Sequence, residues 1–141
     1  MSTDVKSKTF LNSLSAATAS VAALQTTSGA DNLTLAAAAG TGAFHDTDQA
    51  CKLTITSTGN ISGVTFTVTG TDIAGNALTE DITGPNNTTV TGSKFFNTVT
   101  QIAVDGAVGT NTSVGNAAGT TGGQAVLTAG RTRVRGMQYL F

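Results

Sequence analysis

The sequence predicts an all-β protein, a sandwich or barrel of about seven to nine short antiparallel strands. Thr supplies 28 of the 141 residues and Gly supplies 17, a composition that suits pleated strands joined by tight turns. Apolar residues alternate with threonines through the middle of the chain, and turn residues recur roughly every 8–12 positions. No long stretch combines helical spacing with good helix formers, which argues against a βαβ fold.

Residues 1–30 are expected to form an N-terminal arm. Phe10, Leu14 and Val21 approximate a helical spacing, but Ser and Thr fill the positions between them and compete with the helical backbone. A short helix and an extended segment therefore both remain open, as do packing on the domain and contact with a neighbouring subunit. Residues 11–24 are too polar for a signal-peptide core and too short for a membrane span, so we expect no membrane contact.

Residues 31–130 are expected to form the β-sandwich domain, and its central stretch carries the strongest strand signal. Apolar residues alternate with Thr through 53–56 and 64–69, and a Gly59-Asn60 turn separates the two runs. After an Ala-Gly-Asn turn, residues 77–83 return as another strand. The residues expected in the core are Leu53, Ile55, Val64, Phe66, Val68, Leu78, Ile82, Val90, Phe95, Ile102 and Val104.

The later strands are shorter. Pro85 marks a turn because proline cannot serve in a central strand, and an extended segment follows it. In residues 98–107, Val99 breaks the alternation with Ile102, and a bulge near Thr100-Gln101 would restore it. Further candidate strands are 32–37, 111–114 and 124–128, with a Gly-rich loop at 115–123.

Metal-ligand character is confined to one cluster, His45 with Asp46 and Asp48. A metal site needs three or four suitable ligands, and no second histidine is present, so a solvated turn is the favoured interpretation. We expect no bound metal and no cofactor.

Two further features could carry chemistry, and neither predicts an enzyme. Cys51 is in phase with Leu53, so we interpret it as a buried small hydrophobic residue and not as a nucleophile. Glu80 and Asp81 are neighbours in a strand and point to opposite faces, which does not suit an acid–base pair.

Residues 131–141 are expected to form a C-terminal strand or arm. Strand alternation places Arg131, Arg133 and Arg135 on one face, and an apolar end follows them. Pairing with carboxylates of a neighbouring protein is favoured, packing on the chain's own domain is the alternative, and nucleic-acid contact is a minor option. The residues expected to bind a partner are Phe10, Leu14, Arg131, Arg133, Arg135, Tyr139 and Phe141.

The charge of the chain is low. Only 11% of residues are charged and the formal net charge is -1, whereas free soluble monomers usually carry more charge to resist association. Such a composition suits a subunit that is held in a larger assembly, and we expect a homo-oligomer. Some secreted proteins share this property.

Three segments resemble small structural proteins of tailed bacteriophages: 58–72 (TGNISGVTFTVTGTD), 79–86 (TEDITGPN) and 90–96 (VTGSKFF). The resemblance implies an immunoglobulin-like sandwich with no catalytic residues. It implies a capsid decoration (cement) protein of the virion, assembled in the host cytoplasm, whose partner is the major capsid protein or another virion subunit. A tail, neck (head–tail connector) or fibre-associated protein is the alternative. A carbohydrate-binding sandwich would need solvent-facing aromatics, and Tyr139 is the sole Tyr in a chain without Trp.

Overall fold

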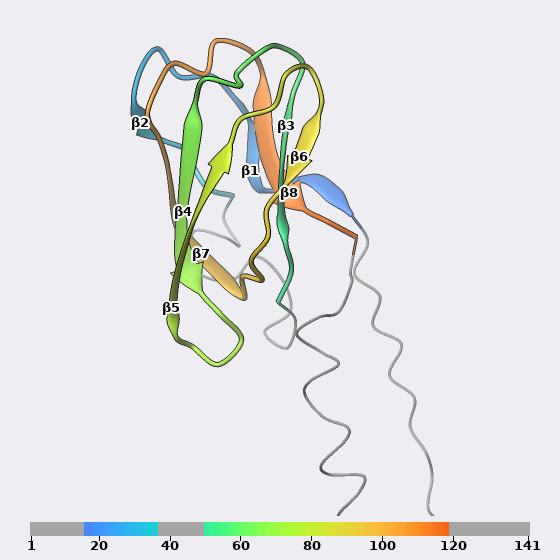
Figure 1. Cartoon of the computed structure of the whole chain (residues 1–141), viewed down its shortest axis with the longest axis vertical. Coiled ribbons are helices and arrows are strands. Elements are labelled where there is room, and N and C mark those ends of the chain that lie inside the picture. The colour runs from blue at the N-terminus through green and yellow to red at the C-terminus, as the bar shows by residue number, and fades with distance from the viewer. Residues whose placement is uncertain (1–15, 37–49, 119–141) are drawn as a thin grey trace, which may run out of the picture.

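The computed structural model describes residues 16–36 and 50–118, which form two antiparallel sheets of four strands each (Figure 1). Sheet I has the strand order β1-β8-β3-β6, and sheet II has the order β2-β7-β4-β5. The all-β prediction is confirmed, and the arrangement is that of a two-layer β-sandwich. The strands are β1 (Ala17–Gln25), β2 (Asp31–Asn32), β3 (Leu53–Ser57), β4 (Thr65–Thr71), β5 (Ala77–Thr83), β6 (Thr89–Thr91), β7 (Thr98–Val104) and β8 (Thr112–Asn116).

The period-2 pattern places the core as the sequence predicts. In β4, Phe66 and Val68 are fully buried while the threonines between them stay partly exposed. Both sheets contribute to one apolar core, and Leu78 and Val90 pack against it from partly buried positions. The predicted core residues that are buried are Leu53, Ile55, Val64, Phe66, Val68, Ile82, Ile102 and Val104.

The prediction for Phe95 is wrong, because Phe96 takes the buried position. Phe96 exchanges two backbone hydrogen bonds with Cys51, at N–O distances of 2.8 and 2.9 Å, and its ring is fully buried. Phe95 is half-buried, and Lys52 Nζ lies 5.3 Å from the centre of its ring. Adjacent extended residues point to opposite sides, so only the pairing with Cys51 decides which ring enters the core.

The predicted bulge is confirmed. Thr69 of β4 pairs with Gln101, but the next residue, Gly70, pairs with Val99, so Thr100 is the extra residue in β7. The bulge lets Val99 and Ile102 both face the core despite their odd spacing, and both are fully buried.

Part of the predicted N-terminal arm lies in the sandwich. Residues 17–25 form strand β1 of sheet I, so the helix alternative is wrong for this stretch. Its pairing with β8 is irregular, with register shifts on either side of Ala22, and Val21 and Ala22 are buried. Burial against β8 outweighs the weak helical pattern, which Ser and Thr already compromise.

The start of the predicted 115–123 loop is also a strand. Gly115 and Asn116 belong to β8, which lies between β1 and β3. A Cβ atom on Gly115 would stand 1.7 Å from the carbonyl oxygen of Ala17, so the glycine permits close approach of strands β1 and β8. Of the described part of the 32–37 candidate, residues 32–36, only Asn32 is in a strand, and the 124–128 candidate lies outside the described residues.

Candidate functional site

All seven residues predicted to bind partners lie outside the described residues. Two of them, Phe10 and Leu14, are near the N-terminus, and the other five belong to 131–141. The structure does show where their segments join the sandwich. Ala17 pairs with Asn116 where β1 begins and β8 ends, and the Ala117 N–H donates to the Lys52 carbonyl at 2.9 Å. The two ends of the described domain are therefore neighbours, at the same end of sheet I (Figure 1).

Cys51 lies in the core as predicted. It is 2% exposed, and burial raises the pKa of its thiol to about 12. The thiolate is the reactive form of cysteine, and it is strongly disfavoured here at neutral pH. Cys51 therefore acts as a packing residue of the core, paired across an antiparallel bridge with Phe96.

The candidate ligands His45, Asp46 and Asp48 lie outside the described residues. Within residues 16–36 and 50–118, no three His, Cys, Asp or Glu side chains gather closely enough to hold a metal ion. The same residues contain no helix with the length and apolarity needed to cross a membrane.

Glu80 and Asp81 lie on opposite faces of β5, as predicted. Glu80 is 8% exposed, and its carboxylate accepts hydrogen bonds from the backbone N–H groups of Ser93 and Lys94. Asp81 is exposed and accepts a 2.7 Å hydrogen bond from the Thr67 hydroxyl. Glu80 thus holds the β6–β7 loop against β5, and Asp81 presents a carboxylate on the outer face.

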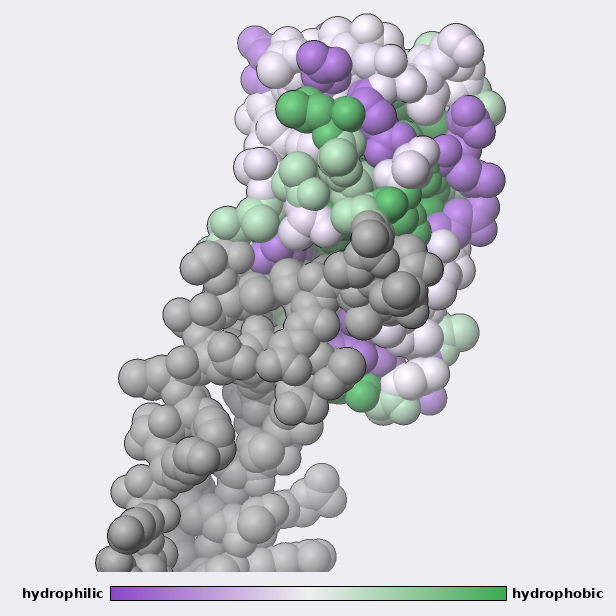
Figure 2. Space-filling view, turned by 180° about the vertical axis from the view of Figure 1, so that it is seen from behind, coloured by the Kyte–Doolittle hydropathy of each residue, from purple (hydrophilic) through white to green (hydrophobic). Residues whose placement is uncertain are grey.

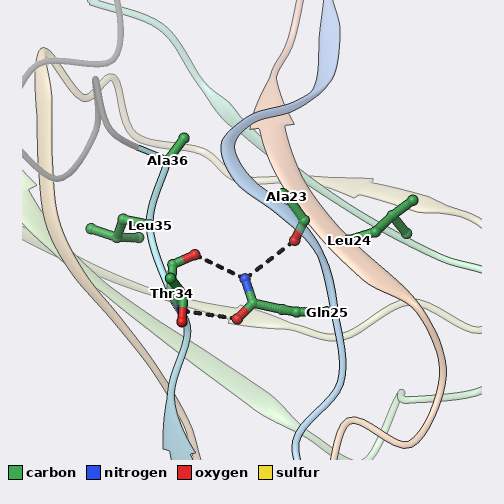
Figure 3. Close-up of a pocket in the computed structure, with 6 residues that line it drawn as sticks. All are labelled: Ala23, Leu24, Gln25, Thr34, Leu35 and Ala36. Carbon is green, nitrogen blue, oxygen red and sulfur yellow. Dashed lines mark hydrogen bonds between the residues drawn. The ribbon is translucent and has the colours of Figure 1, made fainter.

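The edge of β1 that faces away from β8 is covered by the chain's own segment 33–36. The Ala36 N–H donates to the Val21 carbonyl at 2.8 Å. The Gln25 side-chain amide takes the role of a strand, because it accepts from the Thr34 N–H at 2.8 Å and donates to the Thr34 carbonyl at 2.9 Å (Figure 3). It also donates to the Ala23 carbonyl at 3.2 Å, so the Val21 and Ala23 carbonyls on this edge both have partners within the chain.

A shallow hollow of about 250 Å³ lies between β1 and that covering segment. Leu24 and Leu35 line it on either side of Gln25, together with alanine side chains (Figure 3). Leu24 is 64% exposed, and among the described residues it is the one large apolar side chain that lies mostly in solvent. On the face of the described residues seen in Figure 2, apolar side chains are interspersed with neutral and hydrophilic ones.

The edge of β5 in sheet II is long and mostly open. β5 pairs with β4 over seven residues, and no strand of the described residues pairs with its other side. The Lys94 ammonium donates to the Thr79 carbonyl on that side at 2.6 Å. Charged side chains on an edge protect it against indiscriminate pairing, and Lys94 and Asp81 both supply that protection.

The described residues are acidic as a set. Two lysines stand against five carboxylates, which gives a net charge of −3, while residues 119–141 carry three arginines and no acid. Two of the carboxylates accept backbone hydrogen bonds: Asp72 within its own turn, and Asp105 from Thr65 at the start of β4. A hydrogen bond from the Asn76 side chain is the main cause of the lowered pKa of Asp72, and the Thr65 N–H lowers the pKa of Asp105.

Comparison of the chain with family models, curated proteins and solved structures finds no match.

Proposed function

We propose that this chain is a non-enzymatic structural subunit of a bacteriophage particle, and specifically a capsid decoration (cement) protein that binds the major capsid protein. The observation that carries the proposal is the shared departure point of the two terminal segments, beside the Ala17–Asn116 pair. Every residue predicted to contact a partner belongs to a segment that joins the sandwich there. Both terminal segments therefore leave the described domain from neighbouring points, which we propose as its attachment end.

The resemblance of segments 58–72, 79–86 and 90–96 to phage structural proteins supports the assignment to the virion, and we propose that the sandwich is immunoglobulin-like. Its two four-stranded antiparallel sheets with short strands are in keeping with that architecture. The low charge of the whole chain suits a protein whose surface is largely covered by neighbours.

The mechanism is adhesive. The core of the sandwich gives a rigid body, and the terminal segments reach adjacent capsid subunits from its attachment end. Each contact is small, but many copies placed on a regular shell let weak contacts sum to firm attachment. Bridging adjacent subunits in this way resists their separation and stabilises the shell.

Purified particles provide the test. Two truncations, one lacking residues 2–15 and one lacking 119–141, remove the terminal segments but keep β1 and β8 intact. We expect both to lower occupancy on particles, measured by quantitative mass spectrometry. Thr58→Glu is the matched control, because this exposed residue follows β3 at the opposite end.

The copy number from the same measurement separates the candidate positions, since a decoration protein is far more abundant than a neck, tail or fibre protein. Absence of the chain from purified particles would refute the proposal. So would full occupancy by both truncations.

A further inference from the structure

We propose that the free edge of β5 accepts residues 131–135 of a neighbouring copy as an additional strand of sheet II. This inference deepens the proposed function, because it names a contact through which adjacent copies would join. It depends on a comparison of the four strand edges, on the direction of the β5 backbone groups, and on the distribution of charge.

Among the four edges in the described residues, β5 is the one suited to strand addition. β1 is covered by residues 33–36 and the Gln25 amide. β2 has two residues and β6 has three, which is little for a partner strand to follow. β5 has seven residues in regular register with β4.

The hydrogen bonds of the β4–β5 pair show which β5 groups face outward. The Gly84 N–H donates to the Val64 carbonyl at 2.8 Å, and the Asp72 N–H donates to the Asn76 carbonyl at 3.0 Å. In an antiparallel pair, hydrogen-bonded residues alternate, so the even-numbered residues of β5 bond to β4. The N–H and C=O groups of Ala77, Thr79, Asp81 and Thr83 therefore point to the free edge.

One of these groups already has a partner, because the Lys94 ammonium donates a hydrogen bond to the Thr79 carbonyl. No other described residue bonds to the outward backbone groups of Asp81 and Thr83. A strand added here would satisfy these groups by main-chain hydrogen bonds, which is how extended peptides bind sheet edges elsewhere.

Charge identifies the occupant. The outward face of β5 carries Asp81, and two β5 edges paired with each other across a two-fold axis would bring like carboxylates together, which is destabilising. Arg131, Arg133 and Arg135 alternate, so one strand places all three on the Asp81 side. Thr132 and Val134 would then lie on the side of Leu78 and Ile82, which face the core.

The length of the chain allows the contact. Twelve residues, 119–130, separate the described domain from Arg131 and span up to about 40 Å when extended. That is enough for the C-terminal segment of one copy to reach the β5 edge of the next.

The test measures self-association of the full-length protein by sedimentation velocity over a range of concentrations. Thr83→Pro removes an outward N–H without touching the β4 pairing, and we expect the association constant to fall about tenfold, the equivalent of one to two net hydrogen bonds. Thr91→Pro is the matched control. Hydrogen-bonded residues alternate in the β3–β6 pair as well, and the Thr91 N–H points away from β3, to the outer edge of β6. We expect it to associate as the unmodified protein does.

Charge is tested separately. Asp81→Asn keeps an acceptor for the Thr67 hydroxyl but removes the charge, so association should weaken and lose its sensitivity to salt. Asp81→Arg should weaken it further, and combination with Arg133→Glu should restore part of the loss. Circular dichroism confirms that each variant stays folded.

Three results would overturn the inference: a monomer at every concentration, equal effects of Thr83→Pro and Thr91→Pro, or unchanged association of the Asp81 variants. A monomer whose β5 amides are nevertheless protected from hydrogen exchange would show that the chain's own segment occupies the edge. Occupancy on particles is measured independently, so loss of self-association with retained particle binding would leave the proposed function standing.

Discussion

Replacement of Glu80 by glutamine tests whether a buried carboxylate holds the β6–β7 loop against β5. Glu80 comes from the middle of an edge strand, yet its side chain turns inward and meets the backbone of the loop. The Ser93 N–H donates to Oε1, and the Lys94 N–H is shared between Oε1 and Oε2 at 3.3 and 3.2 Å. Gly92 leaves room for this arrangement, because a Cβ there would stand 2.8 Å from Oε2.

The expected loss follows from these contacts. Glutamine is nearly the same size, so it leaves no cavity, but one of its two terminal atoms is an amide nitrogen that faces a backbone donor. The side chain then keeps one acceptor, and the loop loses a hydrogen bond to a charged group. Such bonds contribute about 1.5–3 kcal/mol, so we expect the free energy of unfolding to fall by about 2–3 kcal/mol for Glu80→Gln.

Urea denaturation followed by circular dichroism measures this change, and thermal unfolding should show a drop of about 4–8 °C per kcal/mol for a folded unit of this size. Asp81→Asn is the control, because it removes the adjacent exposed carboxylate and should change stability by less than about 0.5 kcal/mol. Both are measured at low protein concentration so that association does not contribute. Equal stability of the two variants would refute the role given to Glu80.

Three further predictions concern the core and the β4–β5 turn. Phe96→Ala should cost about 3–5 kcal/mol of stability, and Phe95→Ala clearly less, since only Phe96 is fully buried; denaturant unfolding that ranked them the other way would contradict the packing. The Cys51 thiol, with a pKa of about 12, should react with a maleimide only in denaturant, and rapid labelling of the native protein near pH 7 would contradict its burial. The pKa of Asp72 is lower in the folded than in the unfolded chain, so the unfolded chain binds more protons in acid. Its stabilising effect should thus be complete above the ordinary pKa of an aspartate carboxyl and lost as the pH falls through the folded pKa. Unfolding of Asp72→Asn followed against pH should lack this component, and an unchanged acid profile would contradict the assigned hydrogen bonds from Asn76.

The sequence by itself determined the strands of the central stretch. The alternation in 53–56, 64–69 and 77–83 is a local property, since side chains of a strand point to opposite faces whatever the strand pairs with. The same reasoning predicted a bulge near Thr100-Gln101, because Val99 and Ile102 can share a face only if one residue is extra, and the structure makes Thr100 that residue. It also placed Cys51 inside and set Glu80 and Asp81 on opposite faces.

Only the tertiary structure decided which strands become neighbours and which edges stay open. Phe96 and not Phe95 enters the core because of a partner 45 positions away in the chain, Cys51. Gly115 belongs to a strand because Ala17 passes close beside it, and a Gly-rich segment carries no sign of that approach. Within residues 16–36 and 50–118, Gln25 covers the β1 edge and no strand covers the β5 edge. Both outcomes have the same physical reason: hydrogen bonding across a sheet joins residues that are distant in sequence, and no local pattern records the choice of partner.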